Sequence, residues 1–231
     1  MTQPYRLHYA PDNASLIIRL VLEELGLPFE TFLVDRRTSE QRSEAYLKLN
    51  PAGKIPTLET VHGPVSEVGA ILIYLSETHG ILAPPVGDTA RPAFLKWLFF
   101  TTNTLHPDLA MLFYLHRFGP AEAITDMHSC TTNRLISHLS LLDEAAGTTP
   151  WFAAEQPSVV DYYVAACLRW AALYPITGTG WFDLSAYPNL QGLAQNLETR
   201  PAVRVAIQAE GLGPTPFSSP QYPNPPEGVA L

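Results

Sequence analysis

One segment of the sequence offers a backbone, rather than a side chain, that can bind a ligand. In Asn50–Leu58 a proline, Pro56, follows the turn at Gly53 and stands where a strand begins. A proline entering a strand in this way favours the cis form, which turns the N–H and C=O of Ile55 outward. Those two groups can pair with an extended peptide as an added strand would. The alternative interpretation is a proline that only shapes a turn.

Polar side chains also stand where two helices are expected to begin. Asn13 and Ser15 follow the turn at Pro11. Glu67 directly precedes an apolar helical pattern. The N-terminus of a helix attracts anions, because its first N–H groups are free and its dipole is positive there. The same residue types are ordinary helix caps, so anion chemistry and simple capping both remain open.

The cysteines and the composition exclude several classes of function. Cys130 and Cys167 form no CxxC pair and lack metal-ligand spacing, so we expect reduced thiols and no metal. The net charge of −8 argues against a nucleic-acid partner, since phosphate binding requires a basic surface. No apolar run is long enough to cross a membrane. The chain enters a strand pattern at once, so we expect no signal peptide and a cytoplasmic location.

The N-terminal part of the chain alternates strands and helices. Period-two alternation predicts a strand at Tyr5–Tyr9, and the apolar residues of Phe29–Val34 indicate a second strand. Helical spacing predicts a helix between them that Gly26 ends. Strand, helix and strand with short joints indicate a parallel βαβ unit. The next elements, in order, are a polar irregular helix over 36–50, a hairpin over 57–66 and a helix over 67–78.

After a proline- and glycine-rich linker the strand signals vanish. The remaining helical patterns cover 91–118, 122–146, 158–172, 187–198 and 201–209. Six prolines from Pro214 to Pro226 exclude a helix at the end of the chain. We therefore expect an α/β domain joined to an all-α domain. The predicted boundaries are 1–83 for the first domain, 84–90 for the linker, 91–210 for the all-helical domain and 211–231 for a proline-rich tail.

Several spaced motifs resemble those of cytosolic glutathione transferases. The run Asn50–Leu58, followed by Glu67–Leu75, resembles the family's cis-proline loop and the acidic start of its next helix. Further matches are Ser158–Tyr162, which resembles the folding motif of the helical domain, and Tyr187–Leu190 and Arg200–Val203, which resemble its last helices. The ordered set covers residues 5–210. It implies the family's fold, with a thioredoxin-like, glutathione-binding N-terminal domain and an all-helical C-terminal domain.

The segment Tyr9–Leu16 looks most like the bacterial beta class, which has cysteine then serine at the positions of Ala14 and Ser15. Ala14 removes the thiol and excludes mixed-disulfide chemistry there. The resemblance implies that Ser15, with Asn13 as second donor, stabilises the thiolate of glutathione. Lowering a thiol pKa of ~8.5 by about two units requires ~2.7 kcal/mol. A helix N-terminus and a hydroxyl donor together just reach that figure. Capping of the helix is the alternative.

The same resemblance assigns residues to glutathione, the co-substrate. Glu67 would bind the ammonium of its γ-glutamyl end, and the N–H of Val68 its carboxylate. Val68 replaces a serine of the family, which deletes a hydroxyl but keeps the N–H. Ile55, held by Pro56, would pair with the peptide backbone. Lys54 is best placed for the glycine carboxylate, with surface solvation as the alternative.

The second substrate is expected to bind near residues from both domains. In the beta class a histidine at the position of His106 lines the active-site cleft, and the lysine that follows it is replaced here by Pro107. Pro11 and Tyr114 are the other candidates for this pocket. Interior packing is the alternative for His106 and Tyr114. Ser158 and Asp161 resemble a capping box, and the expected role of this pair is in folding.

These features predict a glutathione transferase that conjugates the thiolate to an electrophilic small molecule and forms a homodimer, as the family implies. Two other classes remain open. One is a non-catalytic binding protein of transferase fold, to which Ala14, Val68 and Pro107 point. The other is a glutathione-dependent reductase or lyase, which would require a cysteine in the site.

Overall fold

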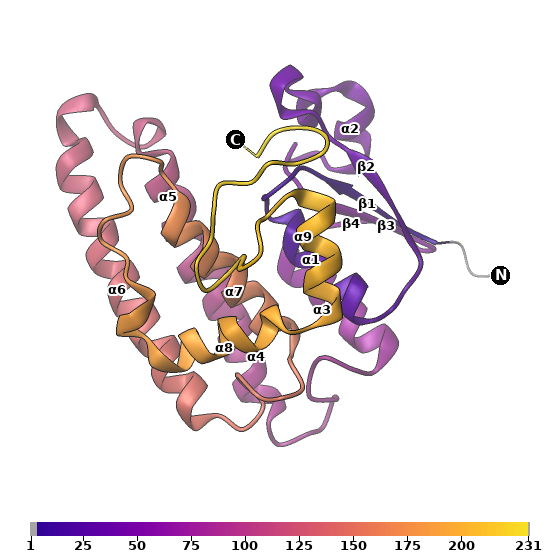
Figure 1. Ribbon diagram of the computed structural model, residues 1–231. Coiled ribbons are helices and arrows are strands. Elements are labelled where there is room, and N and C mark those ends of the chain that lie inside the picture. The colour runs from indigo at the N-terminus through magenta and orange to yellow at the C-terminus, as the bar shows by residue number, and fades with distance from the viewer. Residues whose placement is uncertain (1–3, 231) are drawn as a thin grey trace. The chain divides into compact units, whose positions relative to one another are not determined.

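The computed structural model describes residues 4–230, whose contacts form two compact units (Figure 1). Unit 1 contains the described residues up to Ala83, Glu198–Pro216 and those from Gln221 onward. Unit 2 contains Pro84–Leu197 and Phe217–Pro220. The last helix and most of the tail therefore belong with the N-terminal part of the chain, which the predicted domain boundaries do not anticipate.

A four-stranded mixed sheet forms the centre of unit 1. The strands are β1 (Tyr5–Tyr9), β2 (Phe29–Leu33), β3 (Thr57–Thr60) and β4 (Gly63–Ser66), in the order β2-β1-β3-β4. β1 and β2 are parallel, whereas β3 is antiparallel to both β1 and β4. This confirms the predicted βαβ unit, the hairpin and the thioredoxin-like fold.

Three helices group together in unit 1: α1 (Ser15–Glu24), α3 (Val68–His79) and α9 (Pro201–Glu210). α1 packs against β1, α3 and α9, because its apolar residues Leu16–Leu22 are fully buried apart from one arginine. In Figure 1 these helices lie beside the sheet, apart from α2 (Glu44–Leu49). The predicted irregular helix over 36–50 consists of two short 3-10 turns followed by α2.

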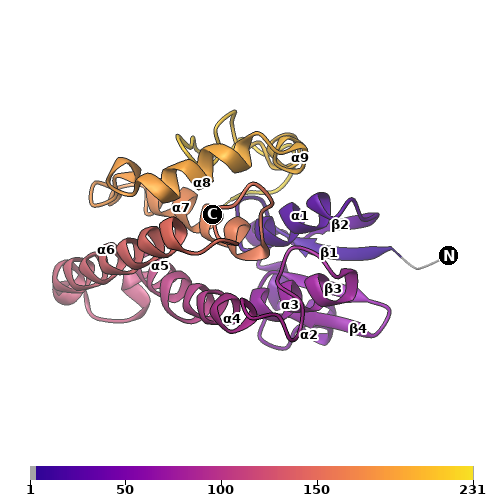
Figure 2. The ribbon, with the colours of Figure 1, turned by 90° about the horizontal axis from the view of Figure 1, so that it is seen from below.

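Unit 2 is helical, and its central element is α7. Its helices are α4 (Arg91–Phe100), α5 (His106–Phe113), α6 (Ile124–Thr148), α7 (Val159–Leu173) and α8 (Pro188–Glu198). α7 is buried along almost its whole length, and α4 and α5 pack against it. Figure 2 shows the long α6 and the shorter α5 and α4 from below. The predicted all-helical architecture is confirmed.

The long helix predicted over 91–118 is interrupted in two places. A π-helical turn, Thr101–Leu105, separates α4 from α5, and α5 ends at Phe113 before a short 3-10 turn. Pro107 explains the first interruption, because proline has no N–H to donate and its ring clashes with the preceding turn of an α-helix. A wider π turn removes that clash, and such turns are frequent next to functional residues. His106 directly follows this one.

The start of α7 is held by a buried capping box. Ser158 is its N-cap and Asp161 accepts from the N–H and the Oγ of Ser158, at 2.7 and 2.6 Å. Asp161 also accepts from the N–H of Ala153 at 2.7 Å and is 1% exposed. The pair therefore fixes both the helix start and the loop before it, in agreement with the folding role expected from the sequence.

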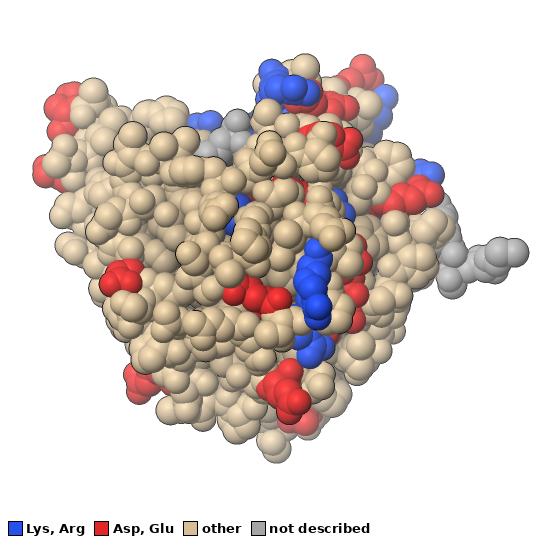
Figure 3. All heavy atoms as spheres, in the orientation of Figure 1, with Lys and Arg blue, Asp and Glu red and all other residues tan. Residues whose placement is uncertain are grey.

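Charged side chains are dispersed over the face of the molecule shown in Figure 3, where acidic and basic residues alternate with large uncharged areas. This distribution matches the modest charge content of 16%. Among the helices of residues 4–230, none combines the length and the apolar character that a bilayer-spanning helix needs.

Candidate active site

Strand register brings most of the predicted site residues of unit 1 to one edge of the sheet. Thr57, the first residue of β3, pairs with His8 of β1 and with Ser66 of β4. Pro56 therefore lies beside the carboxyl end of β1, and Glu67 lies beside Pro56. The loop from Tyr9 to the start of α1 leaves from the same edge, as does the end of β2. A ligand along this edge would meet the predicted groups of three separate segments.

The hydroxyl of Ser15 faces the interior. Ser15 is fully buried, its Oγ donates to the carbonyl of Ala10 at 3.0 Å, and it accepts from the Ala10 N–H at 3.2 Å. Both hydrogen-bonding roles of the hydroxyl are thus used to fold the loop before α1. This geometry matches the structural alternative for Ser15, and in this arrangement the hydroxyl has no proton to offer a thiolate.

The side chain of Asn13, unlike that of Ser15, is not fully buried. Its Oδ1 accepts from the N–H of Ala14 at 2.8 Å, and its side chain is partly exposed. The Nδ2 amide makes no hydrogen bond within residues 4–230. A side-chain donor therefore remains available one residue before the N-cap of α1, next to the first turn of that helix.

A buried hydrogen-bond network that no sequence pattern predicts holds the loop between β1 and α1. Glu210 of α9 accepts from the N–H of Asp12 at 2.8 Å and from Nε of Arg19 at 2.7 Å. Arg19 in turn lies over the ring of Tyr9, 4.8 Å from its centroid. Burial raises the pKa of the Glu210 carboxyl and Arg19 opposes that rise. Asp12 has a positive φ of 49°, so its conformation depends on this anchor.

We expect Glu210→Gln to loosen the loop without unfolding the chain. The amide still accepts one hydrogen bond, but the charge that balances the buried Arg19 is lost, at a cost of about 3 kcal/mol in unfolding free energy. Amide hydrogen exchange at Asp12 and Asn13 should accelerate at the same time. Glu30→Gln, which removes an exposed partner of Arg6, is the control and should change neither quantity. Unchanged exchange at Asp12 would show that Glu210 does not position the loop.

The loop before β3 has the predicted geometry. The Ile55–Pro56 bond is cis. The N–H and C=O of Ile55 make no hydrogen bond within residues 4–230, and the Lys54 carbonyl accepts from Tyr46 Oη at 2.7 Å and Asn50 Nδ2 at 2.8 Å. The loop is therefore anchored through Lys54, leaving the next peptide free to pair, while the Lys54 side chain is exposed.

Glu67 occupies a strained and unsatisfied position at the start of α3. Its φ of 69° and ψ of 117° are outside the regions that side chains other than glycine prefer. Its exposed carboxylate makes no capping hydrogen bond and no other interaction within residues 4–230. Backbone strain of this kind is concentrated at binding and catalytic sites. The buried Val68 follows as the first residue of α3, so its N–H is one of the free donors of the helix end.

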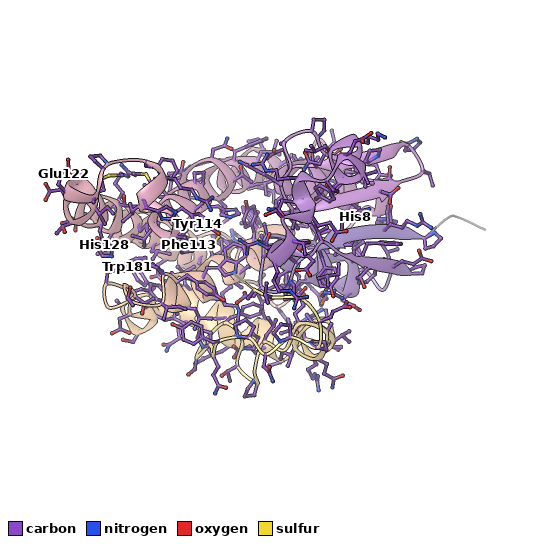
Figure 4. All side chains as sticks on the ribbon, turned by 90° about the horizontal axis from the view of Figure 1, so that it is seen from above. His8, Phe113, Tyr114, Glu122, His128 and Trp181 are labelled. Carbon is purple, nitrogen blue, oxygen red and sulfur yellow. The ribbon has the colours of Figure 1, made fainter. Side chains whose placement is uncertain are left out.

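The two predicted site residues of unit 2 differ in their surroundings. His106 Nδ1 lies 2.8 Å from the hydroxyl of Tyr163, and its ring packs 5.1 Å from Trp170. Tyr114 is the C-cap that follows α5, and Arg117 lies over its ring, 4.0 Å from the centroid. Figure 4 shows Tyr114 near Phe113 at the end of unit 2 that also carries His128 and Trp181. His106 is thus a packed, hydrogen-bonded histidine, and Tyr114 is part of an aromatic surface.

Neither metal nor cysteine chemistry has a visible site in the described chain. Within residues 4–230, His, Cys, Asp and Glu side chains form no group of three or more that could hold a metal ion. Both cysteines are free. Cys167 is buried, which raises the pKa of its thiol, and Cys130 is exposed on α6 of unit 2. The Tyr9 hydroxyl is not available to donate to an anionic ligand, because it already donates to the Glu227 carboxylate. Burial and Glu227 raise the pKa of this hydroxyl.

Comparison with known proteins identifies the family. The model for the glutathione S-transferase N-terminal domain matches residues 14–78, and that for the C-terminal domain matches residues 131–195. The glutathione S-transferase GST-4.5 of Xanthomonas campestris pv. campestris is 30% identical over 210 residues, covering 90% of this chain and 99% of that relative. The chain belongs to the glutathione transferase family.

Solved structures agree with this transferase in fold. A sphingomonad glutathione S-transferase complexed with glutathione is 32% identical, with a TM-score of 0.74 over 90% of this chain and all of that one. The disulfide-bond oxidoreductase YfcG of Escherichia coli is also similar, being 29% identical over 220 residues that cover 90% of this transferase and 96% of YfcG. The predicted family and fold are therefore confirmed.

Proposed function

We propose that this transferase conjugates the thiolate of glutathione to an electrophilic small molecule. The observation that carries the proposal is the convergence of Asn13, Ile55 and Glu67 at one edge of the sheet, each with a polar group that has no partner within the described chain. Family membership and a relative complexed with glutathione support glutathione as the ligand of these groups.

Each part of glutathione meets a matching group in this proposal. The γ-glutamyl ammonium binds the Glu67 carboxylate, and its carboxylate binds the N–H of Val68 at the start of α3. The cysteinyl backbone pairs with Ile55 beside Pro56. Lys54 offers its ammonium to the glycine carboxylate. The cysteinyl sulfur then lies toward the start of α1.

At that position the thiol can ionise more readily than in water. The first N–H groups of α1 and the Nδ2 amide of Asn13 favour the anion, and the proton passes to solvent. The thiolate attacks the electrophilic carbon. A sulfur–carbon bond forms and the leaving group departs with its electron pair, or, in an addition, the adjacent carbon takes a proton from water. Pro11, in the loop before α1, is the proposed contact of the second substrate in unit 1.

Titration calorimetry with glutathione and with an S-alkyl glutathione tests the proposal directly. Binding of both at micromolar to low millimolar concentration, together with conjugation of an activated aryl halide, would support it. Absence of binding for both would mean that Val68 and the missing lysine at Pro107 have removed the site, and a non-catalytic binding protein would be the better description.

We propose Asn13 rather than Ser15 as the donor to the thiolate, because the Ser15 hydroxyl is bonded to Ala10 whereas the Asn13 amide keeps a donor. We expect Asn13→Ala to raise the pKa of bound glutathione by about one unit and to lower kcat/KM about tenfold, the size of a hydrogen bond to a charge. Ser15→Ala should leave the pH profile unchanged and reduce the unfolding free energy by about 1 kcal/mol. The pH dependence of conjugation and thiolate absorbance measure both. A shift with Ser15→Ala alone would restore the sequence-based assignment.

Reduction of disulfides with glutathione is a second candidate, favoured by the similarity to YfcG. A reductase of the kind considered from the sequence would require a cysteine in the site. Cys167 is buried in α7, so glutathione itself would have to supply both thiols. Assaying Cys130→Ser and Cys167→Ala variants with a small organic disulfide and two equivalents of glutathione would separate this activity from conjugation.

The remaining parts of the proposal concern assembly and location. Family members usually form two-fold dimers, and light scattering on the purified chain would give a mass near twice 25.5 kDa if this one does. We place the protein in the cytoplasm, because glutathione keeps that compartment reducing and both cysteines are free thiols.

A further inference from the structure

The end of the chain folds back over unit 1 as an ordered strap, residues 224–230, rather than trailing away. Between α9 and the strap, Phe217–Pro220 belong to unit 2, whereas the strap, the last part of the yellow tail in Figure 1, belongs to unit 1. The strap contains no helix or strand, as its prolines require. Its contacts within unit 1 are specific.

Three hydrogen bonds attach the strap. The Asn224 N–H donates to the Gly211 carbonyl at 2.8 Å, where the tail begins. The Tyr9 hydroxyl donates to the Glu227 carboxylate. Arg36 Nη1 donates to the Ala230 carbonyl at 2.6 Å. The anchors therefore lie at the beginning, middle and end of the strap.

Glycines allow the closest approaches. A Cβ on Gly228 would lie 2.7 Å from Leu33 Cδ1 and 3.2 Å from Pro11 Cδ, and the φ of Gly228 is 73°. A Cβ on Gly211 would lie 2.0 Å from the Asn224 carbonyl oxygen, and its φ is 64°. Neither place admits another residue without displacing the strap. Close packing and a left-handed backbone at both glycines show that the strap is an integral part of the fold of unit 1.

The strap lies at the same sheet edge as the candidate active site. Tyr9 ends β1 and Leu33 ends β2, and the two residues pair with each other. The strap thus covers the β1 and β2 end of the edge, whereas Ile55 and Glu67 occupy the β3 and β4 end. The loop that carries Pro11 connects β1 to α1 between them. A substrate that approaches the sulfur beside Pro11 meets the strap.

We propose that the strap forms one wall of the electrophile pocket and that Glu227 is a specificity-determining carboxylate there; this inference rests on the proposed function. Tyr9 fixes one carboxylate oxygen of Glu227, while the residue remains exposed and the other oxygen has no partner within the described residues. A fixed negative charge beside the pocket repels electrophiles that carry a carboxylate and favours neutral or cationic ones. The strap therefore selects electrophiles according to their charge.

A pair of aryl chlorides that differ in charge tests this selection. We would compare kcat/KM for 4-chloro-3,5-dinitrobenzoate and for its neutral primary amide, from which the thiolate displaces chloride in the same way. In Glu227→Gln the ratio of benzoate to amide should rise about fivefold, the effect of one exposed charge. Gly228→Ala, whose added Cβ would displace the strap from Leu33, should raise the ratio of benzoate to amide as well. Glu44→Gln, an exposed carboxylate on α2, is the charge-matched control and should leave it unchanged.

Glutathione calorimetry on the same proteins distinguishes the possible failures. Unchanged glutathione affinity with a raised ratio supports the inference. A ratio that stays within twofold of wild type in both strap variants, with conjugation intact, overturns the role of the strap alone. If wild type neither binds glutathione nor conjugates either chloride, the proposed function falls, and the strap inference falls with it.

Discussion

Asp161→Ala is expected to lower the free energy of unfolding by about 3 kcal/mol, with little effect on the chemistry of the molecules that remain folded. The substitution leaves the N–H groups of Ser158 and Ala153 without their acceptor and removes the Asp161 half of the capping box of α7. α7 is the central helix of unit 2, so its first turn cannot loosen without disturbing α4 and α5. Urea denaturation followed by circular dichroism measures the loss.

An exposed cap of the same chemistry provides the control. Asp183 accepts from the N–H and the Oγ of Ser185, at 2.9 and 2.8 Å, but its side chain is exposed. Asp183→Ala should therefore cost about 0.5–1 kcal/mol. Comparable losses from both variants would show that burial of Asp161 adds nothing, and lost activity with intact stability would show that its role is not in folding.

The contribution of Asp161 to the free energy of unfolding is expected to fall as the pH rises. Burial raises the pKa of Asp161 to about 6, although hydrogen bonds from Ser158 and Ala153 oppose the rise. The unfolded value is ~3.9, so between these values the folded chain binds the additional proton. The stabilisation linked to that proton is fully present below about pH 4 and is lost as the pH rises through about 6. The stability advantage of wild type over Asp161→Asn should decline across this window.

Local patterns explain why so much of the fold could be predicted. The strands of unit 1 and the helices of unit 2 follow from period-two and helical spacing, and the spaced motifs identify the family. The capping box of α7 lies within four consecutive residues, and the cis proline follows a glycine turn. Each of these features depends on neighbours in sequence, so one chain is sufficient to detect it.

The features that escaped prediction depend on residues far apart or on side-chain direction. Tyr9 and Glu227 are 218 positions apart, and Arg19 and Glu210 are 191 apart. No sequence signal links such pairs, and the packing of α9 on α1 was missed for the same reason. The spacing predicted Ser15 near the start of α1, but not that its hydroxyl turns toward Ala10, because spacing alone does not give a rotamer.

Substitution of Glu67 is expected to have a large effect on glutathione binding, because this residue combines a strained backbone with a carboxylate that has no partner within residues 4–230. In Glu67→Gln the carboxylate that would face the γ-glutamyl ammonium becomes neutral, so the Kd for glutathione should rise at least tenfold, as expected for a lost charge-assisted hydrogen bond. Glu77→Gln removes the same charge near the other end of α3 and should not change the Kd. Calorimetry measures both values.

Glu67→Gly separates this binding role from a structural one. Glycine adopts a φ of 69° without the strain that a side chain brings, so the variant should unfold at a higher temperature than wild type while binding glutathione at least tenfold more weakly. A residue kept for stability would show the reverse, since its removal would lower the melting temperature. Gain of stability together with loss of affinity would mean that the strain at the start of α3 is retained because the carboxylate must face the ligand. Unchanged affinity in both Glu67 variants would remove Glu67 from the site and would leave the free N–H groups of α3 as the only anchor for the γ-glutamyl end.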